Sequence, residues 1–96
     1  MNDMEFHEAL DMMVKSSEKA TEAFEILASP WPPDKRRLIL ASALFDQANA
    51  GIRDFLEATK NIDEARVPYL RSAKKKCRKA LKRHRLVLKK IRPYVV

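Results

Sequence analysis

The sequence predicts an all-α protein, a three-helix antiparallel up-down-up bundle with a strongly basic third helix. Three observations support this prediction. The composition is rich in Ala, Leu, Lys, Arg and Glu, which favour helix. The chain holds a single glycine, whereas the tight turns of a small sheet protein usually require several. Apolar residues also recur at intervals of three and four through three long segments, which are separated by two short breaks.

The length and composition predict one domain, residues 1–96, with a real apolar core. The hydrophobic fraction of 46% is enough for such a core in a chain of 96 residues. A lone cysteine, Cys77, excludes an internal disulfide and suits a reducing compartment. The amino-terminal residues are acidic where a secretory signal carries cations, and the longest apolar run, Leu38–Phe45, is far shorter than the ~20 residues of a membrane span. We therefore expect a cytoplasmic protein.

The first helix is predicted from about Asp3 to Ala28. Asn2 or Asp3 is suited to cap its amino terminus. Three prolines within residues 29–33 remove amide donors and hold the chain extended, so the helix ends there. Trp31, between these prolines, is expected to cover one end of the core. The apolar stripe follows steps of three and four residues and comprises Phe6, Leu10, Met13, Ser17, Ala20, Phe24 and Leu27.

The second helix is predicted from Pro33 or Asp34 to about Thr59. Its apolar face spans roughly 160° on a helical wheel, which suits a middle helix with two neighbours. Gly51 lies within this face, although a glycine inside a helix costs about 1 kcal/mol relative to alanine. We therefore expect another helix to cross closely at Gly51.

The third helix is predicted to begin between Asp63 and Tyr69 and to end at about Arg92, before Pro93. Because short connections join three comparable helices, the first and third are expected to be neighbours in the bundle. A two-helix hairpin that dimerises and leaves a long third helix free is the alternative arrangement. The predicted buried stripe comprises Leu70, Ala73, Cys77, Ala80, Leu81, His84, Leu88 and Ile91.

Charge is distributed very unevenly along the chain. Residues 1–29 hold seven acids and two lysines, whereas residues 66–96 hold thirteen lysines and arginines and no acid. On a helical wheel, most of the cations of the third helix lie away from its apolar stripe. The candidate polyanion-binding residues are Arg71, Lys75, Arg78, Lys79, Lys82, Arg83, Lys89 and Lys90.

This pattern predicts a non-catalytic binding protein that contacts the backbone of DNA or RNA with little sequence specificity. Cations on one side of a long helix neutralise several phosphates together. The residues after Ala73 include no Asn, Gln, Ser or Thr, which are common readers of base edges. The simpler interpretation is a solvated face, partly neutralised by Asp11, Glu18 and Glu25 of the first helix. Seven acids are too few to balance thirteen cations, however.

A small protein-interaction module, such as an adaptor, inhibitor or regulator with an acidic protein partner, is the alternative function. Leu86 lies in the middle of the cationic arc, where it is either an ordinary exposed leucine or an apolar interface anchor. Binding to an anionic membrane is disfavoured, because the apolar stripe of the third helix is needed for the core. Both a monomer and a homodimer are compatible with the sequence.

No residue pattern in the chain predicts catalysis, a metal site or a cofactor. His7 and Asp11 share a helix face but lack the third ligand that a catalytic zinc needs. His84 and Cys77 lie within the apolar stripe and are expected to be core residues. Arg78 and His84 have a spacing found in some helical ribonucleases, yet on a continuous helix they lie about 120° apart.

Overall fold

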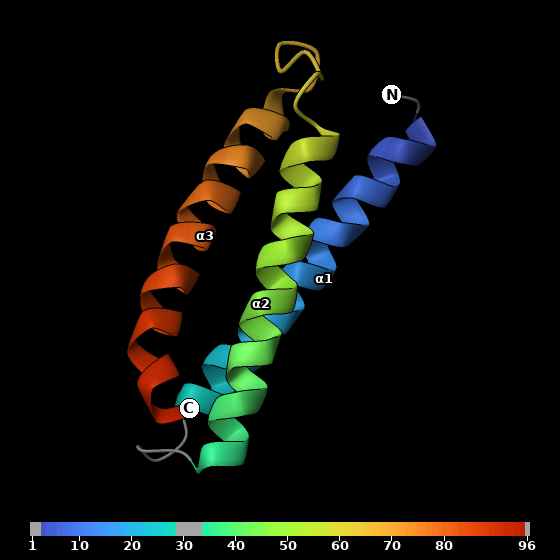
Figure 1. The fold of residues 1–96 in the computed structure, drawn as a ribbon. Coiled ribbons are helices and arrows are strands. Elements are labelled where there is room, and N and C mark those ends of the chain that lie inside the picture. The colour runs from blue at the N-terminus through green and yellow to red at the C-terminus, as the bar shows by residue number, and fades with distance from the viewer. Residues whose placement is uncertain (1–2, 29–33, 96) are drawn as a thin grey trace.

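The protein is a bundle of three helices, as predicted (Figure 1). The computed structural model describes residues 3–28 and 34–95, with side chains from Phe6 onward. The helices are α1 (Asp3–Ala28), α2 (Lys35–Ala58) and α3 (Pro68–Val95), and the chain reverses direction between consecutive helices. Because α2 packs against both α1 and α3, the third helix is not free. The predictions for Asn2 and Trp31 concern positions outside the described residues.

Local hydrogen bonds fix the helix ends. The Arg37 amide donates to Asp34 Oδ1 at 2.9 Å, so Asp34 caps α2. The Thr59 hydroxyl donates to the Phe55 carbonyl at 2.7 Å where α2 ends. Pro68 begins α3 as predicted, but α3 continues beyond Arg92 to Val95. The predicted end at Arg92 was therefore too early, because the φ angle of Pro93 is compatible with a last helical turn.

Small residues form the contact between α1 and α2. Ala9, Ser16 and Ala23 of α1 are buried. A Cβ atom on Gly51 would overlap Ser16 Oγ and would lie 3.3 Å from Ser16 Cβ. The predicted close crossing at Gly51 is confirmed.

The predicted stripe of α1 was wrong in part. Ala20 is buried as expected, but Ser17 is exposed, whereas Ser16 and Ala23 are buried. The close crossing at Gly51 turns the small residues of α1 toward α2. The larger side chains of Met13 and Phe24 consequently lie half-buried to one side of this contact.

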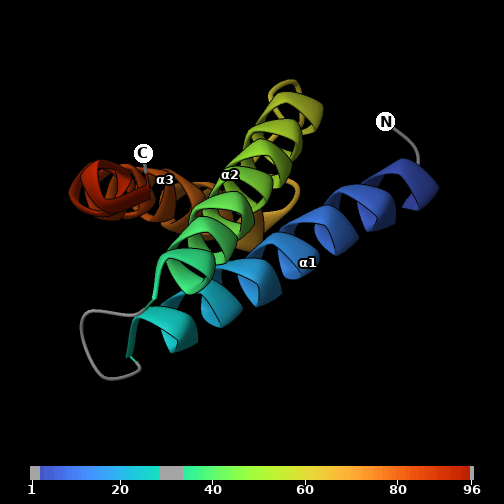
Figure 2. The same cartoon turned by 60° about the horizontal axis from the view of Figure 1, so that its bottom comes forward.

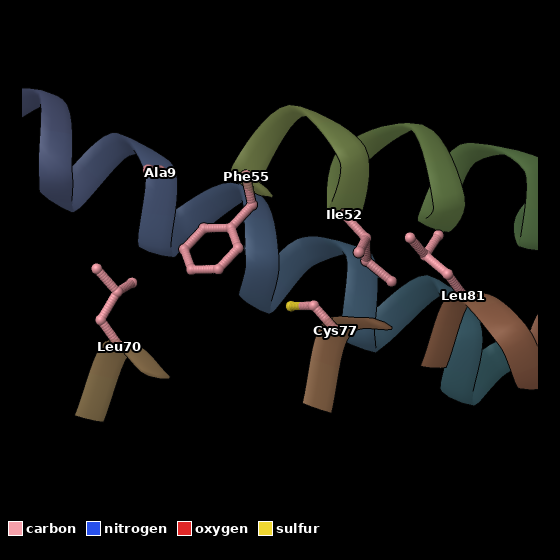
Figure 3. Packing of buried hydrophobic residues seen from close by; sticks show 6 residues of the cluster. All are labelled: Ala9, Ile52, Phe55, Leu70, Cys77 and Leu81. Carbon is pink, nitrogen blue, oxygen red and sulfur yellow. The ribbon is translucent and has the colours of Figure 1, made fainter. Parts of the chain in front are cut away.

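Two apolar clusters, each with residues from all three helices, make up the core. The first consists of Ala9, Ile52, Phe55, Leu70, Cys77 and Leu81. Figure 3 shows Leu70, Cys77 and Leu81 pointing from α3 toward the other two helices. The second consists of Ala23, Leu38, Ala41, Phe45, Leu88 and Ile91. The central residues of the predicted α3 stripe are therefore buried, and most of the cations of α3 lie on its other side.

The expectation that α1 and α3 pack directly together was wrong. Over the described residues, these helices make no close backbone contact, and Figure 2 shows them running in different directions. Side chains bridge the gap at two levels. The Phe6 and Tyr69 rings lie 6.0 Å apart, and the Phe24 and His84 rings lie 5.9 Å apart.

An interhelix groove of about 740 Å³ lies between α1 and α3. Its walls come from these two helices, and Ile52 of α2 also lines it. Because small residues form the α1–α2 contact, α1 lies close to α2. It also runs at an angle to α3, which leaves the groove between these two helices.

Candidate polyanion-binding surface

The eight predicted cations all lie on the exposed side of α3. We call them the basic face: Arg71, Lys75, Arg78, Lys79, Lys82, Arg83, Lys89 and Lys90. Among the described residues, none of the eight forms an ion pair with an acidic side chain. Their arrangement follows from the fold, because the opposite side of α3 is buried against α2.

Two other cations of α3 are paired, and both lie on its α2 side. Lys74 Nζ lies 3.4 Å from Glu64 Oε1, and only 5% of the Lys74 side chain is exposed. Arg92 lies 3.9 Å from Asp46 in a pair whose side chains are both well exposed. Such an exposed pair contributes at most about 1 kcal/mol. The buried ammonium of Lys74, in contrast, anchors the α2–α3 connection to α3 through Glu64.

The described acidic side chains of α1 form no ion pair with α3. Asp11 pairs within its own helix, with Lys15 at 2.9 Å. Glu18 and Glu25 are exposed and form no ion pair within the described part of the chain. The simpler interpretation, in which these three acids pair with cations of α3, is therefore wrong on this point, because the interhelix groove separates α1 from α3.

Arg83 differs from the rest of the basic face. Its guanidinium carbon lies 4.6 Å from the centroid of the Phe24 ring, within the range of a cation–π interaction. A guanidinium stacked on a ring still presents its N–H groups outward in its own plane. Arg83 therefore lies at the edge of the basic face, next to the groove, with its orientation fixed by α1.

Leu86 is exposed at the centre of the basic face. Its exposed fraction is 57%, among the larger values for an apolar side chain in this protein. The helical wheel predicts this position, since Leu86 lies opposite the buried stripe. An apolar side chain ringed by cations is therefore available to a partner.

Lys76 is a further cation of the candidate site, and it is not among the eight predicted residues. It is exposed and lines the interhelix groove together with Arg83. Its wheel position beside the apolar stripe is readable from the sequence. Its surroundings depend on the separation of α1 and α3, which the spacing of apolar residues does not reveal.

His84 is a buried core residue, as predicted. Its Nδ1 atom donates a hydrogen bond to Asn49 Oδ1 at 2.8 Å, and its ring lies 5.1 Å from the ring of Phe45. Burial lowers the pKa of His84, and the nearby Arg83 lowers it further. The imidazole is therefore neutral at pH 7 and links α3 to α2 as a hydrogen-bonding core group.

Cys77 is also buried, as expected, and Arg78 beside it is exposed. Burial raises the pKa of the Cys77 thiol, although Arg78 acts in the opposite direction. The thiolate is thus disfavoured at neutral pH. Arg78 and His84 lie on different sides of α3, so their side chains do not converge on one ligand.

Comparisons with protein-family models, with curated proteins and with solved structures find no match for this chain. Within residues 3–28 and 34–95, no helix is long and apolar enough to cross a bilayer. The described side chains also include no group of three or more His, Cys, Asp or Glu residues arranged to hold a metal ion. The function must therefore be inferred from the surface itself.

We expect the stability of the protein to fall as the pH drops below about 6.5, the ordinary pKa of histidine. The unfolded chain then binds a proton that buried His84 does not, so the free energy of unfolding falls until the pH reaches the lowered pKa of the folded state. One such group contributes a slope of at most ~1.4 kcal/mol per pH unit. Urea unfolding between pH 5.5 and 7.5 measures it.

His84→Gln should reduce this slope, because it removes the buried imidazole. Equal slopes for the wild type and His84→Gln would show that His84 is not the group responsible.

Proposed function

We propose that this protein is a non-catalytic binding protein that uses the basic face of α3 to bind a polyanion, the backbone of DNA or RNA. The observation that carries the proposal is a row of eight exposed cations without paired acids among the described residues. A helix of 28 residues is about 42 Å long. Phosphates repeat every 3.4 Å along each strand, so a helix of this length reaches several of them.

Packing supports the proposal because it fixes α3 before any ligand binds. Leu70, Leu88 and Ile91 are buried against the other helices, so the cations extend from a rigid helix. Binding then requires ordering of side chains alone, and the release of counterions from the phosphates favours it.

The expected sequence specificity is low. Contacts from Lys and Arg to phosphates fix position without reading bases. The part of α3 that carries most of the basic face offers no Asn, Gln, Ser or Thr. Its cations are also not interleaved with aromatic residues, which would stack on the bases of a single strand. Duplexes are therefore the favoured ligands. A cytoplasmic location, suggested by the single cysteine, is part of the same proposal.

Fluorescence anisotropy with labelled duplex DNA and duplex RNA, measured across a salt series, tests the proposal. We expect log K to fall steeply and linearly with log salt concentration. The double variant Lys75→Glu/Lys82→Glu should lower affinity at least about tenfold and reduce the slope by about two, because two phosphate contacts are lost.

Lys19→Glu/Lys35→Glu is the matched control. It changes net charge by the same amount at exposed positions of α1 and α2, away from the basic face. We expect a much smaller loss of affinity from this control. If micromolar protein binds neither duplex at low salt, or if both double variants weaken binding equally, the proposal is wrong.

The alternative is a protein-interaction module that binds an acidic protein partner, and the exposure of Leu86 is the observation that favours it. The centre of a protein interface is usually apolar, with charges toward the rim. Leu86→Ala should therefore weaken binding to such a partner more than any single charge change does. In the duplex assay, by contrast, Leu86→Ala should leave affinity within about twofold.

A further inference from the structure

The interhelix groove leaves apolar surface uncovered on the side of the molecule away from α2. Its lining includes Met13, Ala20 and Phe24 of α1, together with Ala73 and Ala80 of α3. None of these five residues is charged. Excluding water from the interior of the groove therefore lowers the free energy.

Two large and well exposed side chains with apolar surface also line the groove. Val14 on the α1 side is 50% exposed, and Tyr69 on the α3 side is 54% exposed. A monomer gains nothing by displaying two such side chains beside an apolar groove. Exposed apolar side chains that gather beside a groove are a feature of interaction surfaces.

The two rims of the groove carry opposite charges. Glu18 lies on the α1 rim, whereas Lys76 and Arg83 lie on the α3 rim. The groove holds the rims apart, and no ion pair joins α1 to α3 among the described side chains. An occupant that matches this surface must therefore offer a cation opposite Glu18 and an acid opposite Lys76, around an apolar centre.

We propose that a second copy of this chain covers the groove, forming a two-fold dimer in which α1 of each chain lies against α3 of the other. The two-fold axis runs parallel to the helices. In this arrangement the Glu18 rim of each chain faces the Lys76 rim of its partner, and the interface contains each pair twice. The side chains of Val14 and Tyr69 then lie within the interface.

Charge selects this orientation over the other face-to-face arrangement. A two-fold axis perpendicular to the helices would place α1 against α1 and α3 against α3. The third helix carries twelve lysines and arginines and no acid, so two copies of it would repel strongly. The first helix carries seven acids and two lysines, so its two copies would repel as well.

The register of the helices is also suitable. The Phe6–Tyr69 contact and the Phe24–Arg83 contact mark two levels of the bundle at which α1 and α3 correspond. Interpolation between them places Glu18 level with the turn of α3 that begins at Lys76. An axis parallel to the helices preserves this level, so Glu18 of one chain meets the Lys76 turn of the other.

The available area is sufficient for a stable dimer. The molecule measures 46 × 21 × 20 Å, so one long side has a projected area of roughly 900 Å². Stable protein interfaces bury about this area on each partner. The basic face remains largely exposed on the far side of α3, so dimerisation is independent of the proposed function and is tested without nucleic acid.

Sedimentation equilibrium at 150 mM salt tests the dimer. We expect the wild type to dimerise at micromolar concentrations. Glu18→Lys and Lys76→Glu should each weaken the dimer at least about tenfold, because each variant places like charges together twice. A 1:1 mixture of these two variants should form a heterodimer, since every repulsive pair becomes attractive in it.

Two control variants test whether the effect depends on the position of the charge at the groove. Glu22→Lys on α1 and Lys75→Glu on α3 make the same charge changes at exposed positions that do not line the groove, and both should dimerise like the wild type. Far-UV circular dichroism verifies that each variant is helical. A wild type that stays monomeric at concentrations on the order of 100 micromolar overturns the proposal. Equal effects of Glu18→Lys and Glu22→Lys, or a mixture that stays monomeric, overturn it as well.

Discussion

Phe45→Ala should lower the free energy of unfolding by about 3–5 kcal/mol. The Phe45 side chain is fully buried in the second core cluster. Its ring meets that of Phe24 edge-on at 5.0 Å and lies 5.1 Å from that of His84, so it joins α2 to both other helices. Truncation removes these contacts and leaves a cavity. Because a small domain has a total stability of only about 5–15 kcal/mol, this loss is a large fraction of the total.

Urea denaturation, followed by far-UV circular dichroism, measures the loss. Leu40→Ala is the matched control on the same helix, because Leu40 is largely exposed. It should change stability by no more than about 0.5 kcal/mol. Phe45→Leu should fall between the two. A loss below about 1.5 kcal/mol for Phe45→Ala would mean that α1 and α3 do not depend on this ring for their packing.

The third helix could be predicted almost completely from the sequence. Most of its many cations must stay hydrated, so the narrow apolar arc is the main arc available for burial. Leu70, His84 and Ile91 are buried accordingly. The basic face lies on the side of α3 opposite that apolar arc. The spacing of apolar residues therefore predicted its exposure too.

The first helix was harder to predict because its two candidate stripes differ in side-chain size. Met13 and Phe24 are the more hydrophobic residues, and they favour the wrong stripe. Ser16 and Ala23 are buried instead because Gly51 on the facing helix permits a close approach. Which stripe is buried therefore depends on a tertiary partner, and the periodicity of one helix does not contain that information.

The interactions between segments distant in sequence also escaped prediction. Lys74 is buried with Glu64, and His84 is bonded to Asn49, 35 residues away. Both pairs depend on the angle and register of α3 on α2. The interhelix groove was not predicted for the same reason. The separation of α1 and α3 depends on the angle at which each of them crosses α2.

Gly51→Leu should destabilise the protein by about 3 kcal/mol or more. The first atom of any side chain at this position overlaps Ser16 Oγ and lies 3.3 Å from Ser16 Cβ, with the Met12 carbonyl oxygen at 3.6 Å. Rotation of the Ser16 hydroxyl relieves the first overlap but leaves the tight Cβ contact. A leucine adds three further carbons and therefore forces α1 away from α2. Urea denaturation measures this loss of stability.

A double-mutant cycle with Gly51→Ala separates two contributions to the free energy of unfolding, the close helix crossing and the helix propensity of residue 51. Alanine is better than glycine inside a helix by about 1 kcal/mol, so the substitution is stabilising wherever space allows. In the wild type it should be destabilising, because the overlap with Ser16 costs about 1–3 kcal/mol. In a Ser16→Gly background the clash is removed, the remaining contact with the Met12 carbonyl is ordinary, and the same change should become stabilising. An effect of the same sign in both backgrounds would mean that Gly51 is not required for the approach of α1 to α2.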